Sequence, residues 1–193
     1  LVKFDISNNK LYVAGCEALA AALSGNQTMT ELNVSSNSMG WIDWNHEGTS
    51  GVIAMANAIK TMGVMVKLDM STNSICAEGG KLLAAALKDN QIMTELNIAD
   101  NNLGSEGTWY GAKADMSGVI AISNAIPNMG ALTSLNISSN NIGQYDLPHG
   151  WQLKKDTGWK YELKDGKTLP DGNRGQDSPP PGSKSTGVLA LAD

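Results

Sequence analysis

The stretch that decides the fold is residues 93–103, which reads MTELNIADNNL. Closely similar stretches lie at residues 29–39 (MTELNVSSNSM) and 132–142 (LTSLNISSNNI). Looser versions at residues 1–11 (LVKFDISNNKL) and 65–75 (MVKLDMSTNSI) bring the number of copies to five. Recurrence of one phrase along a chain indicates a repeat protein, in which each unit packs on its neighbours.

Within each copy the spacing of the apolar residues changes from that of a strand to that of a helix. Apolar residues occupy the first, fourth, sixth and eleventh places, and the two-residue step from the fourth to the sixth predicts a short strand with one buried face. Beyond the eleventh place the apolar residues follow helical spacing, as in Gly15, Leu19 and Leu23. Each copy therefore predicts one strand, one turn, and one helix that opens near a glycine and returns antiparallel to the strand.

Repeats of this pattern resemble the ribonuclease-inhibitor-like class of leucine-rich repeats. The resemblance covers repeats 1–28, 29–64, 65–92, 93–131 and 132–193. It implies an α/β leucine-rich repeat solenoid, or horseshoe, with a parallel β-sheet on the concave face and helices on the convex face. Because the chain begins on a strand residue and stops inside an expected helix, we expect residues 1–193 to be a segment of a longer array.

Asparagine stands at the ninth place of every copy, and the five residues are Asn9, Asn37, Asn73, Asn101 and Asn140. The chain leaves the strand there, so backbone groups need partners outside the sheet. A carboxamide can both donate and accept hydrogen bonds. We expect these side chains to be structural.

Unequal repeat lengths come from insertions at one place, between the eleventh residue and the helix-opening glycine. The extra residues lie before Gly51, before Gly118 and, as the large insertion 143–186, before Gly187. Residues 186–193 (TGVLALAD) then match 50–57 and 117–124, which predicts that the fifth helix resumes there. The large insertion carries turn signals at 156–158 and 164–166 between three alternating runs, which predicts a small meander.

All insertions should emerge along one edge of the solenoid, and they hold all five tryptophans. Aromatic side chains on loops are typical of binding hot spots. An equally simple interpretation is that they anchor the loops to the scaffold. The candidate partner-binding residues on this edge are Trp41, Trp44, Trp109, Tyr110, Trp151, Trp159 and Tyr161.

The solvent-facing strand positions give a second candidate surface. The fifth-place residues, which complete the candidate partner-binding set, are Asp5, Asn33, Asp69, Asn97 and Asn136. Third-place residues alternate between lysine and glutamate, which predicts weak cross-strand pairs. The face is polar and suits either contact with a partner or simple solvation.

Composition excludes several classes of function. No apolar run approaches the roughly 18 residues of a membrane span. The net charge is −5, with a single arginine at Arg174, and no basic stripe favours nucleic acid. Two cysteines, Cys16 and Cys76, favour a reducing, cytoplasmic setting. They belong to copies two strands apart, beyond the ~7 Å that a disulfide allows.

No catalytic motif occurs, so we expect neither an enzyme nor a cofactor. Asp43, His46 and Glu47 lie close in sequence, but loop polarity explains them and no metal site is expected. The sequence therefore predicts a non-catalytic scaffold, monomeric or part of a longer chain, that binds a protein partner rather than nucleic acid or membrane. The alternatives are a small-GTPase regulator, by analogy with one branch of the repeat class, and a glycan- or small-molecule-sensing segment of a larger receptor.

Overall fold

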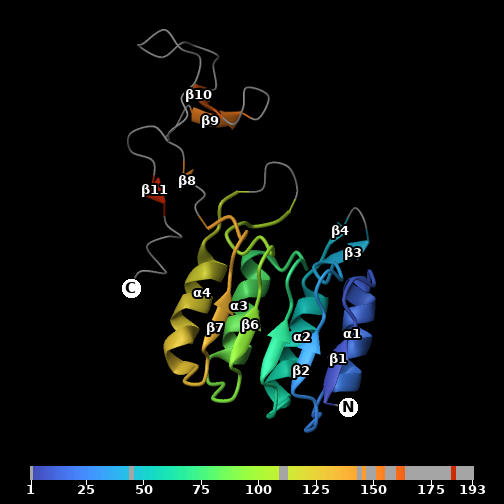
Figure 1. The fold of residues 1–193 in the computed structure, drawn as a ribbon. Coiled ribbons are helices and arrows are strands. Elements are labelled where there is room, and N and C mark those ends of the chain that lie inside the picture. The colour runs from blue at the N-terminus through green and yellow to red at the C-terminus, as the bar shows by residue number, and fades with distance from the viewer. Residues whose placement is uncertain are drawn as a thin grey trace.

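A single parallel sheet runs through the five copies. The computed structural model describes residues 2–43, 46–108, 113–142, 145–146, 151–154, 160–163 and 184–185, with side chains in 2–41, 48–108 and 113–142. The strands, in their spatial order, are β1 (Lys3–Asp5), β2 (Glu31–Asn33), β5 (Lys67–Asp69), β6 (Glu95–Asn97) and β7 (Ser134–Asn136), as Figure 1 shows. Each strand begins at the third place of its copy, so the expected architecture is confirmed.

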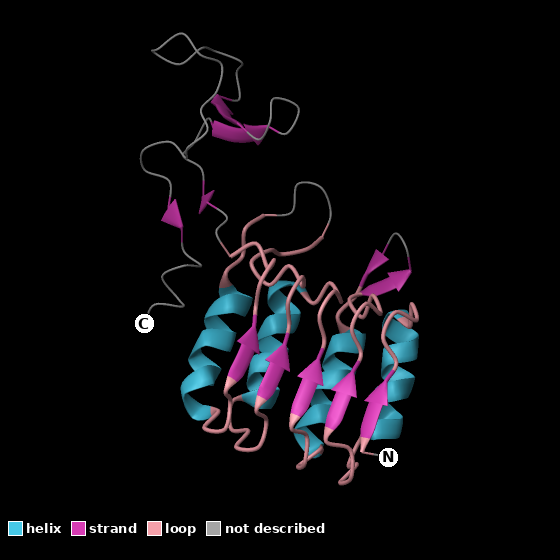
Figure 2. Ribbon diagram, in the orientation of Figure 1, coloured by secondary structure: helices cyan, strands magenta, loops and turns pink. Residues whose placement is uncertain are grey.

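The helices cover only one side of this sheet, and the other side is open (Figure 2). They are α1 (Tyr12–Leu23), α2 (Ser50–Thr61), α3 (Cys76–Leu87) and α4 (Ser117–Ala125), with a 3-10 turn η1 (Ile126–Asn128). In the two short copies the helix begins three residues before the glycine that we expected to open it. In the short copies the helix begins directly after the eleventh-place residue. In the long copies the insertion lies between that residue and the helix, so the helix begins next to the glycine.

The core lies between the sheet and the helices. Fourth-place residues pair in register across the sheet, for example Leu32 with Leu68 and Leu68 with Leu96. Side chains on the same face pack beside several methionines, among them Met39 and Met70, which are fully buried. Each such side chain contributes roughly 1.5–3 kcal/mol of hydrophobic stabilisation when removed from water. Flexible methionines suit the irregular gaps between layers of different length.

The helices also approach one another closely. A Cβ added to Gly118 of α4 would lie 2.7 Å from the carbonyl oxygen and 2.8 Å from the Cα of Ala77 in α3. Backbone atoms cannot move aside as a flexible side chain can, so the position requires glycine. At Gly51 and Gly118 the helix-opening glycine is thus a packing requirement against the backbone of the neighbouring helix.

The ninth-place asparagines form a hydrogen-bonded ladder that joins the copies. The backbone N–H of Asn37 donates to Oδ1 of Asn73 at 3.0 Å, that of Asn73 to Asn101 at 2.8 Å, and that of Asn101 to Asn140 at 2.8 Å. Four of the five residues, all except Asn9, are buried. The expected structural role is confirmed, and the same ladder fixes the register between successive copies.

Left-handed backbone flanks each ladder residue. The eighth and tenth places have positive φ in every copy, for example Asp100 at 54° and Asn102 at 56°. Asparagine and aspartate tolerate this region better than other residues, and β-branched residues tolerate it least. Thr72, with φ of 55°, is therefore strained.

The described parts of the insertions leave from one edge of the sheet, at the ends of the strands (Figure 1). In the second copy β3 (Trp41–Asp43) and β4 (His46–Glu47) pair as an antiparallel hairpin. In the fourth copy Ser105 and Ala114 form an isolated antiparallel bridge. Both insertions start at a glycine, Gly40 or Gly104, where a Cβ would collide with a carbonyl oxygen of the next copy.

The large insertion contains two antiparallel pairs. One joins β9 (Trp151–Lys154) to β10 (Lys160–Leu163), and the other joins β8 (Tyr145–Asp146) to β11 (Lys184–Ser185). The first pair confirms two of the three runs of the expected meander. The third run and the expected helix at 186–193 lie outside the described residues.

Candidate functional site

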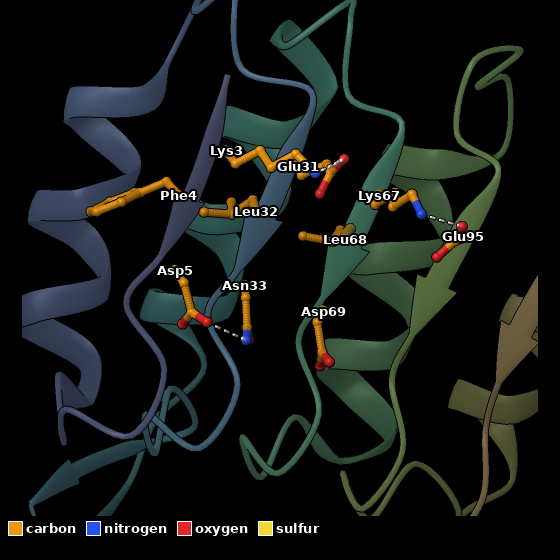
Figure 3. A pocket seen from close by; sticks show the side chains of 10 residues that line it. All are labelled: Lys3, Phe4, Asp5, Glu31, Leu32, Asn33, Lys67, Leu68, Asp69 and Glu95. Carbon is orange, nitrogen blue, oxygen red and sulfur yellow. Dashed lines mark hydrogen bonds and ion pairs between the residues drawn. The ribbon is translucent and has the colours of Figure 1, made fainter. Parts of the chain in front are cut away.

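The open sheet face, made of the third- and fifth-place side chains of the five strands, is hollowed over β1, β2, β5 and β6. The hollow has a volume of about 490 Å³. Figure 3 shows its lining residues, which are Lys3, Phe4, Asp5, Glu31, Leu32, Asn33, Lys67, Leu68, Asp69 and Glu95. The parallel register places these third- and fifth-place residues side by side on neighbouring strands.

Third-place residues form the cross-strand ion pairs that the sequence predicts. Lys3 Nζ lies 2.9 Å from Glu31 Oε1, and Lys67 Nζ lies 2.5 Å from Glu95 Oε1. The hydrogen bond with Glu95 raises the pKa of Lys67 above its ordinary value. Because the partners are largely exposed, these pairs add little to stability, and their main effect is to neutralise both lysines.

Fifth-place residues bind the backbone of their own copies. In every copy their Oδ1 accepts the N–H two residues further on, as Asp5 accepts from Ser7 and Asp69 from Ser71, both at 2.9 Å. The same bond is made by Asn33, Asn97 and Asn136. These are Asx turns, which end the strand and direct the backbone toward the ninth-place asparagine. Sequence reasoning missed this role, although an Asx residue at a strand end is its usual signal.

The second carboxylate oxygen of each aspartate faces the neighbouring strand. Asp5 Oδ2 accepts from Asn33 Nδ2 at 3.2 Å, and Asp69 Oδ2 accepts from Asn97 Nδ2 at 2.9 Å. The backbone N–H of Ser7 is the main cause that lowers the pKa of Asp5. Among the described residues neither aspartate has a cationic partner, so the hollow combines two lysines with four carboxylates and is net acidic.

The lining repeats itself at a spacing of 64 residues. Lys3, Asp5 and Glu31 recur as Lys67, Asp69 and Glu95, and Asn33 recurs as Asn97, which follows the last lining residue on β6. Two copies, rather than one, are therefore the repeating unit of this surface. Sequence reasoning noted the lysine–glutamate alternation at the third place but did not extend the two-copy period to the fifth place, although the alternating repeat lengths were a visible signal of it.

A family model described as "Leucine Rich repeat" matches residues 25–40, 89–107 and 132–144. These three matches begin at or just before the strands β2, β6 and β7, which belong to the five-copy array described above. This chain is a leucine-rich repeat protein. Its repeats are of the ribonuclease-inhibitor-like type, and the sheet and helix layers correspond to the concave and convex faces of that fold.

Two solved structures resemble this leucine-rich repeat protein in fold. One is the tropomodulin C-terminal domain of Caenorhabditis elegans, with a TM-score of 0.57 and 14% identity, over 72% of this chain and 74% of that one. The other is leiomodin-1 actin-binding site 2, with a TM-score of 0.54 and 15% identity, over 70% of this chain and 69% of that one. At these identities the likeness concerns the fold alone.

The aromatic candidates on the insertion edge are only partly described. Trp41 begins β3, which lies against α1, and its side chain is half-buried. Trp151 pairs with Leu163, and Tyr161 pairs with Leu153, in the β9–β10 hairpin. The residues that lie outside the described ones are Trp44, Trp109, Tyr110 and Trp159. The partial burial of Trp41 agrees with loop anchoring.

Among the described residues, no group of three or more His, Cys, Asp or Glu could hold a metal ion. Cys16 and Cys76 are both buried and are not joined by a disulfide, as expected for residues two strands apart. Burial, with a smaller effect of Glu17, raises the pKa of Cys16 to about 12, so its thiol is protonated and unreactive. None of the helices in the described ranges has the length and apolarity that crossing a membrane requires.

Proposed function

We propose that this leucine-rich repeat protein is a non-catalytic scaffold that binds a protein partner through the open sheet face. The observation that carries the proposal is the net acidic hollow over β1, β2, β5 and β6. Its side chains stand on strands whose register the asparagine ladder fixes, so they are held in place before a partner arrives. Rigid display of polar groups lowers the entropy cost of binding.

The insertion edge is the second contact surface in this proposal. It carries several aromatic side chains, whereas the lining of the hollow holds Phe4 as its one aromatic residue, and it borders the open sheet face where the strands end. Aromatic anchors beside a polar hollow match the usual anatomy of an interface, in which a few rings supply most of the energy and polar groups set the register. Residues 143–186 serve as one insertion within a cytoplasmic repeat array.

The fold gives one specific partner to test. The leiomodin-1 structure that this chain resembles is described as an actin-binding site. Actin is therefore a second, narrower candidate for the partner, and it rests on fold likeness only.

Capture from a native lysate, analysed by mass spectrometry, tests the scaffold and separates its two surfaces. The bait proteins are the unchanged chain, a sheet variant with Asp5→Asn and Asp69→Asn, and an edge variant with Trp41→Ala. A matched control carries Glu17→Gln and Asp89→Asn, which change the same net charge at exposed positions away from the sheet face. Each bait is first shown to be folded by circular dichroism.

A protein captured by the unchanged chain and the control, but weakly by the sheet variant, supports the proposal. Loss with the edge variant alone assigns binding to the insertion edge, and equal capture by all baits refutes both surfaces. Co-sedimentation with filamentous actin and gel filtration with monomeric actin test the narrower candidate. Absence of actin from the pellet and from a shared peak removes actin and leaves the scaffold to the lysate result.

A further inference from the structure

The hollow of the open sheet face, together with Asn97 beside it on β6, presents the same four residue types twice, in two subsites. The first is formed by Lys3, Asp5, Glu31 and Asn33 on β1 and β2, and the second by their counterparts 64 residues later on β5 and β6. Hydrogen bonds and ion pairs are also duplicated, with a Lys–Glu pair and an Asn-to-Asp bond in each. A surface that presents the same groups twice is matched by a ligand that also repeats.

The charge of each subsite selects a cation. Within a subsite the lysine is already neutralised by its glutamate, and the aspartate receives hydrogen bonds from neutral donors only. Asp5 and Asp69 therefore keep their negative charge without a counter-ion among the described residues. Each has two oxygens and about four acceptor positions, so the bonds already made leave room for an ammonium or guanidinium donor.

The distance between the subsites selects the ligand's shape. Asp5 and Asp69 lie on strands separated by one intervening strand, which sets them about 9.6 Å apart along the sheet. A polyproline II segment rises about 3.1 Å per residue with three residues per turn, so residues i and i+3 lie on one side about 9.3 Å apart. A β-strand fits less well, because its residues i and i+3 point to opposite sides.

We propose that the hollow binds an extended segment of a protein partner that carries two basic side chains three residues apart. The segment crosses the strands in a polyproline II conformation, with one cation on Asp5 and the other on Asp69. Its backbone has no internal hydrogen bonds, and the second amide hydrogens of Asn33 and Asn97 can donate to its carbonyls. This inference rests on the proposed function, because it names the chemistry of the partner at the same face.

A peptide series on the unchanged protein tests the spacing directly. The probes are fluorescein-labelled proline peptides of equal length and charge, with two lysines at i and i+3 or at i and i+4, and a third peptide with two glutamates at i and i+3. Binding is followed by fluorescence anisotropy at low salt. We expect the i, i+3 lysine peptide to bind about 2–5-fold more tightly than the i, i+4 peptide, which can place only one cation, and the glutamate peptide not to bind.

Variants then locate the site. Asp5→Asn and Asp69→Asn keep Oδ1 for the Asx turns, so each should fold and weaken the i, i+3 peptide by about 2–5-fold, while the double variant should lose the spacing preference. The variant with Glu17→Gln and Asp89→Asn should bind like the unchanged protein at matched ionic strength. These outcomes do not depend on finding the natural partner.

Equal affinity for both lysine spacings overturns the inference, and so does the same loss in the control variant as in the double aspartate variant. Because the spacing comparison uses the unchanged chain, an unfolded variant cannot obscure it. If lysate capture depends on the sheet face while the peptides show no preference, the scaffold stands and the basic segment is rejected. If the peptides behave as expected but no protein is captured, the binding chemistry stands and the scaffold proposal fails.

Discussion

Removing one rung of the asparagine ladder should destabilise the fold by a predictable amount. The side chain of Asn101 is buried and makes four hydrogen bonds. Its Nδ2 donates to the carbonyl oxygens of Met70, Ile98 and Ala99, and its Oδ1 accepts the backbone N–H of Asn73. Asn101→Ala deletes all four at once.

The cost depends on which of the four partners is left without a hydrogen bond. The three carbonyls each keep another donor, namely Nδ2 of Asn73 for Met70, Nδ2 of Asn140 for Ile98 and the N–H of Thr72 for Ala99. Only the buried N–H of Asn73 becomes an orphan. One unsatisfied buried donor costs about 1–3 kcal/mol, and we expect Asn101→Ala to lower the free energy of unfolding by that amount.

Urea denaturation followed by circular dichroism measures this loss as a shift of the midpoint at constant slope. Native-state hydrogen exchange adds a local readout, because the amide of Asn73 should exchange much faster while amides in β1 do not change. Asn9→Ala is the matched control. The side-chain Nδ2 of Asn9 donates to the carbonyl oxygens of Ile6 and Ser7, the side chain is exposed, and its removal should cost less than about 0.5 kcal/mol.

Equal losses for Asn101→Ala and Asn9→Ala would refute the assignment of the energy to the orphaned N–H. An Asn101→Asp variant tests the other half of the rung, and a stable one would refute the burial of Asn101 among carbonyl acceptors. Aspartate preserves the shape and an acceptor for Asn73, but it removes the amide donors and buries a charge, so it should be less stable than the alanine variant at neutral pH.

Other features of the array give further expectations. Gly118→Ala should destabilise by about 1–3 kcal/mol in urea denaturation because its Cβ meets the backbone of Ala77, whereas Gly63→Ala, facing only the Gln27 side chain at 3.4 Å, should change stability little; equal effects would contradict the packing argument. Thr72→Asn should stabilise by about 0.5–1 kcal/mol in the same assay by relieving left-handed strain at an exposed position, and a loss would mean that the threonine makes a compensating contact. Cys16 should not react with a thiol reagent at pH 8 in the native protein, since burial holds its pKa near 12 and the thiolate forms only well above that pH; reaction should appear on unfolding in urea, and rapid native reaction would disprove the burial.

Much of the array could be predicted because its repeating signals are local. The step from Leu96 to Ile98 fixes which face of the strand is buried, and the ninth-place asparagine fixes where the chain turns. Both signals recur in every copy, so chance agreement at one position hardly matters. The parallel sheet, the one-sided helices and the lysine–glutamate pairs followed from this pattern alone.

Sequence reasoning missed features that depend on contacts between two separate segments of the chain. The need for glycine at position 118 comes from the backbone of Ala77 in another helix, and no local pattern contains it. The Asx turns of the fifth-place residues were missed because those side chains were considered only as a surface. The two-subsite hollow required comparing copies at twice the repeat length, with Asp5 set against Asp69 rather than against Asn33.

The asparagine ladder makes the response to damage depend on position along the chain. Because each rung links only adjacent copies, stability in such an array is transmitted from neighbour to neighbour, as in a one-dimensional chain of coupled units. A defect at Asn37 uncouples only the first copy and leaves the other copies coupled. A defect at Asn73 divides the cooperative unit into two shorter blocks and separates the halves of the acidic hollow. Two equally buried side chains can therefore differ widely in their tolerance to substitution.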